Sequence, residues 1–197
     1  EGFFNALRQS PPPTWYSAVP TMHQEILIFA EEYQSRNGGA APKHHLQFAR
    51  NCSAALLPSV SQRMENVLGL QVVATYAMTE SMPIASNPRR GGRRKLRSVG
   101  FSGGPEILVR RDPEFNKNLE ICKPGEEGHI CVRGECVTHG YEFHPSHMTE
   151  DPNIKAITKD GFLCTGDKGY VDHDGHLVIS GRFKEIINRG GEKISPM

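Results

Sequence analysis

The feature that most constrains the fold is an alternation of strand-like and helix-like segments in the first 76 residues. In chain order the pattern predicts a strand over 14–19, a helix over 23–36, a strand over 46–52, a helix over 58–68 and a strand over 71–76. In the first helix, for example, Ile26, Phe29 and Ala30 fall on one face. Strands that alternate with helices lie parallel and are joined by right-handed crossovers. The sequence therefore predicts an α/β fold, with a partial parallel sheet and crossover helices.

The pattern changes after about residue 96. Short alternating stretches over 106–109, 129–133, 169–172 and 176–180 are separated by turns rich in Gly, Pro and Asp. This spacing is typical of a small antiparallel β sheet or barrel. We expect the boundary within 88–95, where arginines cluster around a glycine pair. This run is read as a solvated loop, with a phosphate-binding patch as the alternative.

Charge and composition exclude several classes of protein. Lys and Arg number 23 against 22 Asp and Glu, which gives a net charge of +1 and argues against a nucleic-acid partner. The longest apolar run, 26–30, is far too short to span a membrane. The five cysteines contain no CxxC pair, so neither a disulfide framework nor a zinc site is predicted. These observations favour a folded protein of a reducing compartment.

The segment 76–80 (YAMTE) is the first candidate site, because the carboxyl ends of strands are where ligands bind in an open α/β sheet. Tyr76 could stack on a base, Thr79 could donate to a phosphate oxygen, and Glu80 could hold Mg²⁺. The same residues could instead be a strand that ends in a Thr-Glu helix cap. Taken alone, the segment leaves both interpretations open.

Two further segments could contact a nucleotide. Asp167, between Gly166 and Gly169, could accept hydrogen bonds from both ribose hydroxyls, although Thr-Gly-Asp is also an ordinary turn. The segment 181–193 combines two cations with a later glycine pair. Neither GxxxxGK[ST] nor GxGxxG occurs in the chain, which weakens a Walker or Rossmann interpretation.

Together these segments resemble, in order and spacing, the signature motifs of the adenylate-forming acyl-CoA synthetase superfamily. The matching segments are 19–23, 76–80, 128–134, 161–167 and 181–185 (VPTMH, YAMTE, GHICVRG, GFLCTGD and GRFKE), and the resemblance extends over about 14–196. The amino-acid sequences of segments 14–21 and 188–196 are most similar to those of the branch that contains oxalate-CoA ligases and peroxisomal CoA synthetases.

The resemblance implies a nucleotide site built from five residues. Tyr76 would stack on adenine, and Thr79 would contact the α-phosphate. Glu80 would bind Mg²⁺. Asp167 would bind the ribose, with help from Arg182.

The resemblance also implies roles around this nucleotide. Lys184 matches the hinge about which a small C-terminal domain turns, and His23 matches a residue beside the acyl pocket. Ser53, Ala54 and Ala55 would line the adenine and acyl sites. Gly190 and Gly191 would border the pantetheine channel. Thr79, Glu80 and Lys184 are thus the candidate catalytic residues.

Departures from the family pattern indicate a piece of a longer protein. The family's phosphate loop would precede Glu1, and its catalytic lysine would follow Met197. We therefore expect three parts: 1–95 as the end of an α/β subdomain of the large domain, 96–180 as a small β-rich subdomain, and 181–197 as the hinge and the start of a C-terminal domain. Ala77 replaces the family's usual glycine, so its methyl group could crowd the nucleotide.

The implied activity is that of an AMP-forming acid-CoA ligase in the cytoplasm or the peroxisome. Such an enzyme uses ATP, Mg²⁺ and CoA as co-substrate to convert a small carboxylic acid into its CoA thioester through an acyl-adenylate. We expect the 197-residue chain alone to bind adenylate weakly without measurable turnover. The alternatives are a truncated, non-catalytic adenylate-binding or interaction module, a nucleic-acid module based on the arginines of 89–97, and a luciferase-like or peptide-synthetase adenylation domain. The sequence specifies neither the acid nor the oligomeric state.

Overall fold

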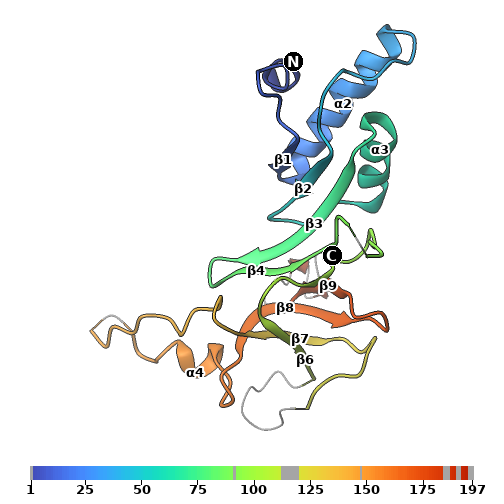
Figure 1. Ribbon diagram of the computed structural model, residues 1–197. Coiled ribbons are helices and arrows are strands. Elements are labelled where there is room, and N and C mark those ends of the chain that lie inside the picture. The colour runs from blue at the N-terminus through green and yellow to red at the C-terminus, as the bar shows by residue number, and fades with distance from the viewer. Residues whose placement is uncertain are drawn as a thin grey trace. The chain divides into compact units, whose positions relative to one another are not determined.

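The computed structural model describes residues 2–90, 92–111, 120–146 and 148–183, together with the backbone of 187–189 and 192–194. The chain forms two compact units (Figure 1). Unit 1 consists of Glu1–Tyr76 with Asn87–Arg97, and unit 2 consists of Ala77–Ser86 with Ser98–Met197.

Unit 1 contains the predicted parallel sheet. Its elements are α1 (Gly2–Ala6), β1 (Trp15–Ala18), α2 (Pro20–Arg36), β2 (Phe48–Asn51), α3 (Pro58–Leu68) and β3 (Gln71–Met78), whose last two residues belong to unit 2. β2 pairs in parallel with both β1 and β3, so Ala18, Asn51 and Ala74 are aligned across the sheet. The predicted α/β arrangement is confirmed.

Local sequence sets where the two long helices begin and end. Proline opens both α2 and α3, at a position where a helix does not need the missing N–H group. For this reason α2 starts at Pro20, three residues before the predicted start. Gly69 ends α3 in the left-handed conformation, with φ of 63°, and its N–H donates to the carbonyl of Glu65.

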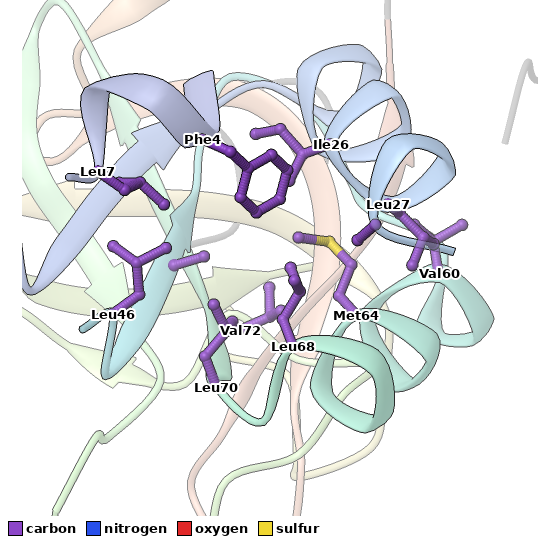
Figure 2. Packing of buried hydrophobic residues seen from close by; sticks show 12 residues of the cluster. Phe4, Leu7, Ile26, Leu27, Leu46, Val60, Met64, Leu68, Leu70 and Val72 are labelled. Carbon is purple, nitrogen blue, oxygen red and sulfur yellow. The ribbon is translucent and has the colours of Figure 1, made fainter. Parts of the chain in front are cut away.

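The core of unit 1 lies between its helices and its sheet (Figure 2). In this view Phe4 and Ile26 lie close together, and Met64 extends toward them from α3. Met64 is completely buried. Burial of the facing sides of these helices is the main contribution that holds the sheet and its crossovers together.

Unit 2 is built mainly from antiparallel strands. They are β4 (Ser81–Ser86), β5 (Phe101–Ser102), β6 (Glu106–Arg110), β7 (Gly128–Arg133), β8 (Leu163–Val171) and β9 (Leu177–Arg182). Strands β6 to β9 form an open four-stranded sheet in sequential order, while β4 pairs with β5. The predicted antiparallel part is thus an open sheet in the described part of the chain. The short helix α4 (Asn153–Ala156) precedes β8, and β10 (Ile187–Arg189) pairs with β11 (Glu192–Ile194).

Strand β8 differs most from the expectation. It starts at Leu163 rather than at Gly169, so the segment Thr165-Gly166-Asp167 lies inside a strand and not in a turn. Gly166 has φ of 79° there. The pairing of β8 with β7 shifts register between His129 and Cys131, which leaves residues 165–167 of β8 as the bulged segment. A strand with a β-bulge and glycines resembles a turn when only its sequence is considered.

The described residues show neither a membrane-spanning helix nor a clustered metal site. Of the helices in that part of the chain, none has both the length and the apolar character that a membrane crossing requires. Within the same residues, no group of three or more His, Cys, Asp or Glu side chains is arranged to hold a metal ion.

Candidate functional site

The turn between β3 and β4 presents Thr79 and Glu80 side by side. Thr79 is exposed and Glu80 is partly exposed. The carboxylate of Glu80 accepts a hydrogen bond of 2.7 Å from the hydroxyl of Tyr141, and its backbone carbonyl accepts one of 2.7 Å from the N–H of Thr138. In the described part of the chain no cationic side chain pairs with Glu80. The turn thus offers a hydroxyl and an uncompensated carboxylate within one residue of each other.

The donor set at this turn fits a magnesium ion held together with a nucleotide. Tyr141 occupies only one oxygen of Glu80, and no described residue is bonded to the other oxygen. Mg²⁺ is usually bound by one or two carboxylates, with phosphate and water oxygens completing its shell. A single carboxylate beside an exposed hydroxyl is therefore compatible with this ion, even though no multidentate protein cage is present among the described residues.

The sequence alone does not single out Tyr141. Burial, the hydrogen bond to Glu80 and the negative charge of that carboxylate raise the pKa of Tyr141 to about 12. The phenol therefore remains a hydrogen-bond donor at neutral pH. Its only local signal is an aromatic residue after Gly140 in a polar loop, which does not identify a partner 61 residues earlier in the chain.

Asp167 and Arg182 come together across β8 and β9. They are paired directly in the strand register, and Arg182 Nε donates to Asp167 Oδ1 at 2.8 Å. Asp167 is 5% exposed, whereas Arg182 is exposed. The backbone N–H of Asp167 donates to the hydroxyl of Thr165 at 3.1 Å, which helps to fix this part of the strand. The structure thus brings together the two residues expected to contact a ribose.

In unit 1, other candidates lie at the carboxyl edge of the parallel sheet. Ser53, Ala54 and Ala55 follow β2 and are exposed, and Ser53 has φ of 68°. Tyr76 follows Ala74, the residue of β3 that is aligned with the end of β2, by two positions. Its side chain is 9% exposed. These residues occupy the edge where ligands bind to parallel sheets.

His23 lies inside unit 1 rather than on an open surface. It is completely buried on α2, and its Nδ1 is 3.1 Å from the hydroxyl of Tyr16. Burial lowers the pKa of His23, although backbone hydrogen bonds oppose this effect. The imidazole is therefore neutral at physiological pH. Three other candidates, Lys184, Gly190 and Gly191, lie outside the described residues.

Comparison with known proteins identifies the family. The family model described as AMP-binding enzyme matches residues 3–142. The chain belongs to the AMP-binding enzyme family. This confirms the resemblance carried by the sequence motifs.

Relatives of this family member include CoA ligases. The chain is 44% identical over 186 residues to an oxalate–CoA ligase of Arabidopsis thaliana, a match that covers 93% of this chain and 33% of the relative. It is 37% identical over 184 residues to a sulfoacetate–CoA ligase of Cupriavidus necator, covering 93% of this chain and 33% of the relative. The chain thus spans about a third of the length of these curated relatives.

Solved structures support the same assignment. ATP-bound MatB from Rhodopseudomonas palustris is 26% identical with a TM-score of 0.75, and the match covers 99% of this chain and 35% of that chain. O-succinylbenzoate Coenzyme A synthetase (MenE) from Bacillus subtilis, in complex with ATP and a magnesium ion, is 28% identical with a TM-score of 0.69. That match covers 93% of this chain and 34% of the other. This AMP-binding family member therefore shares its fold with proteins whose structures contain ATP.

Proposed function

We propose that the protein containing this chain is an ATP-dependent, AMP-forming acid-CoA ligase. It would activate a small carboxylic acid as an acyl-adenylate and transfer the acyl group to CoA. The observation that carries the proposal is the β3–β4 turn, where Thr79 stands beside a carboxylate that pairs with no cation of the described residues. Family membership and the names of the relatives support the same reaction.

The proposed roles follow the family resemblance. Tyr76 would contact the adenine, Thr79 the α-phosphate, and Asp167 with Arg182 the ribose. Glu80 would hold Mg²⁺. Ser53, Ala54 and Ala55 would line the adenine and acyl sites, and His23 would lie beside the acyl pocket as a neutral, buried side chain. Lys184 would serve as the hinge, and Gly190 with Gly191 would border the pantetheine channel.

The first half of the reaction joins two anions. A carboxylate oxygen forms a bond to the α-phosphorus of ATP, and the bond from that phosphorus to the pyrophosphate oxygen breaks. Magnesium, when bound, supplies positive charge that offsets the repulsion between the phosphates and the incoming carboxylate. Thr79 contributes a hydroxyl donor to a phosphate oxygen, and the nucleotide contacts hold the reactants in position.

The second half transfers the acyl group. The sulfur of CoA forms a bond to the acyl carbonyl carbon, the bond from that carbon to the AMP oxygen breaks, and the thiol proton passes to solvent. This step requires no covalent bond between the acyl group and the protein. Positioning by the chain and electrostatic stabilisation supply the catalysis.

Oxalate is the first substrate to test, and sulfoacetate is the second. Both acids carry two negative charges on a short carbon skeleton, and both appear in the names of relatives that cover 93% of this chain. A cytoplasmic or peroxisomal location would suit an enzyme of this kind. For the 197-residue chain alone, we propose weak binding of adenylate without measurable turnover.

The test measures pyrophosphate release by the full-length protein with MgATP, CoA and a panel of oxalate, sulfoacetate, fatty acids and aryl acids. We expect release with a short diacid and a loss of at least about 100-fold in Glu80→Ala, the scale of a lost electrostatic contact to the reacting groups. The matched control is Glu135→Ala, which removes an exposed glutamate of unit 2 with no partner among the described residues. Its rate should change by less than about twofold, as is typical of a surface substitution. Release that is equally fast in Glu80→Ala, or no release with any acid, contradicts the proposal.

A further inference from the structure

Glu80 is held from a segment distant in sequence. The segment 137–141 meets the β3–β4 turn through its backbone, where Ser81 and Val137 form an antiparallel bridge and the N–H of Thr138 donates to the carbonyl of Glu80 at 2.7 Å. The same segment then reaches the side chain, where the Tyr141 hydroxyl donates to Glu80 Oε1 at 2.7 Å. Backbone and carboxylate of Glu80 are thus fixed by one loop.

The backbone of Tyr141 is in turn fixed by Asn153 of α4. The N–H of Tyr141 donates to Asn153 Oδ1 at 2.7 Å, and Asn153 Nδ2 donates to the carbonyl of Tyr141 at 2.8 Å. Asp151 Oδ1 accepts from both the N–H and the Nδ2 of Asn153 at 2.8 Å, which sets the orientation of the amide. The amide oxygen and the amide nitrogen of Asn153 therefore bind the N–H and the carbonyl of Tyr141, respectively.

Gly140 allows this close approach. Its φ is 153°, and a Cβ atom at this position would lie 2.8 Å from Asn153 Oδ1. Any other residue would push the asparagine away from the loop, since contacts below 3.0 Å are essentially never seen for a Cβ atom. Thr138 braces the same loop, because its hydroxyl donates to the carbonyl of Gly140 at 3.0 Å.

We propose that Tyr141, held in place by Asn153, is a positioning residue that orients the Glu80 carboxylate toward the nucleotide-bound magnesium ion. The inference rests on the proposed function, in which Glu80 holds that ion. Tyr141 occupies one carboxylate oxygen of Glu80 and leaves the other for the metal. The hydrogen bond from the Tyr141 hydroxyl also restricts rotation of the Glu80 side chain. Hydrogen bonds to metal-binding carboxylates commonly fix the ligand and tune its affinity in this way.

The proposal predicts a specific change in Mg²⁺ dependence. The full-length protein is titrated with MgCl₂ at a fixed concentration of a fluorescent methylanthraniloyl derivative of ATP, and the Mg²⁺ concentration at half-maximal binding is measured. We expect Tyr141→Phe to raise this concentration about tenfold, the lower end of the effect of losing a partner of a metal ligand. Nucleotide affinity without Mg²⁺ and the melting temperature should not change, because Phe keeps the ring and Tyr141 is 37% exposed.

Two other variants complete the test. Asn153→Ala should shift the Mg²⁺ dependence in the same direction, because it releases the backbone of Tyr141. The matched control is Tyr170→Phe, which removes the hydroxyl of another partly exposed tyrosine of unit 2 that has no hydrogen-bond partner among the described residues. It should leave the Mg²⁺ dependence unchanged.

Glu80→Gln separates a failure of this inference from a failure of the proposed function. If Glu80→Gln leaves the Mg²⁺ dependence unchanged, the assignment of Glu80 to the metal is wrong, and the proposed function loses its basis. If Glu80→Gln shifts it and Tyr141→Phe does not, Glu80 holds the metal without help from Tyr141, and the inference is overturned. A shift in Tyr170→Phe equal to that in Tyr141→Phe would also overturn it, because the effect would then be nonspecific.

Discussion

The substitution Gly169→Ala tests the packing that supports Asp167. A Cβ atom at Gly169 would lie 2.2 Å from the carbonyl oxygen of Val178 and 2.9 Å from Ile130 Cδ1. Because real Cβ contacts essentially never fall below 3.0 Å, strands β8 and β9 would have to separate locally by about 0.8 Å. The obstacle is a backbone carbonyl of the neighbouring strand, so a change of side-chain rotamer cannot relieve it.

The cost should be large for a single methyl group. Overpacking a close-packed interior costs about 1–3 kcal/mol, and we expect the upper end because a backbone group must move. Hydrogen-exchange mass spectrometry of peptides from 163–183 should then show protection reduced by about 100-fold, since 1.4 kcal/mol is a factor of ten. Gly104→Ala is the matched control, because its Cβ would meet only the sulfur of Cys136, at 3.2 Å. Equal protection in Gly169→Ala and the unmodified protein would refute the close approach of β8 and β9.

Two further predictions concern unit 1. Met64→Ala should destabilise unit 1 by about 2–4 kcal/mol because it leaves a cavity in the core, whereas Met22→Ala, at a residue that is 54% exposed, should change stability by less than about 0.5 kcal/mol. Urea unfolding, followed by the fluorescence of the single tryptophan Trp15, measures both changes. Equal effects of the two substitutions would contradict the packing in Figure 2. Lowering the pH from 7.5 to 5.5 should destabilise unit 1, because burial depresses the pKa of His23 and the unfolded chain takes up a proton that the folded state does not, at a slope of at most about 1.4 kcal/mol per pH unit. The same measurement in His23→Gln should show a flatter pH dependence, and an unchanged slope would argue against a buried neutral imidazole.

The sequence predicts best those parts of the fold that depend on neighbouring residues. The sequence predicts the helix over 58–68 with the bounds that α3 has, because Pro58 and Gly69 mark its two ends. The sequence does not predict strand β4, because Pro83 interrupts this short segment. In its sheet β4 lies between β3 and β5, and the residues of β5 come from farther along the chain. Local signals are therefore sufficient for helices with clear ends and insufficient for short strands defined by their partners.

The candidate site likewise contains residues that the local sequence identifies and residues that only distant contacts identify. Glu80 can be selected from the sequence because it stands in a recognisable motif, and the structure adds that it pairs with no cation in the described part of the chain. Tyr141 and Asn153 cannot be selected in this way. Their role depends on hydrogen bonds across 61 and 12 residues of sequence, which no periodicity or spacing encodes.

The pairing of Asp167 with Arg182 shows how a site residue can depend on one irregularity in a sheet. From Gly169 toward the end of β8 the register with β9 pairs Gly169 with Ile179 and Tyr170 with Val178. Continued without a break toward the start of β8, this register would place Asp167 opposite Gly181, which has no side chain. The observed shift between Lys168 and Gly169 adds one residue to β9 and places Arg182 opposite Asp167 instead. Since a slip of one residue also turns a side chain to the opposite face of a sheet, the bulge both selects the partner of Asp167 and keeps the two side chains on the same face.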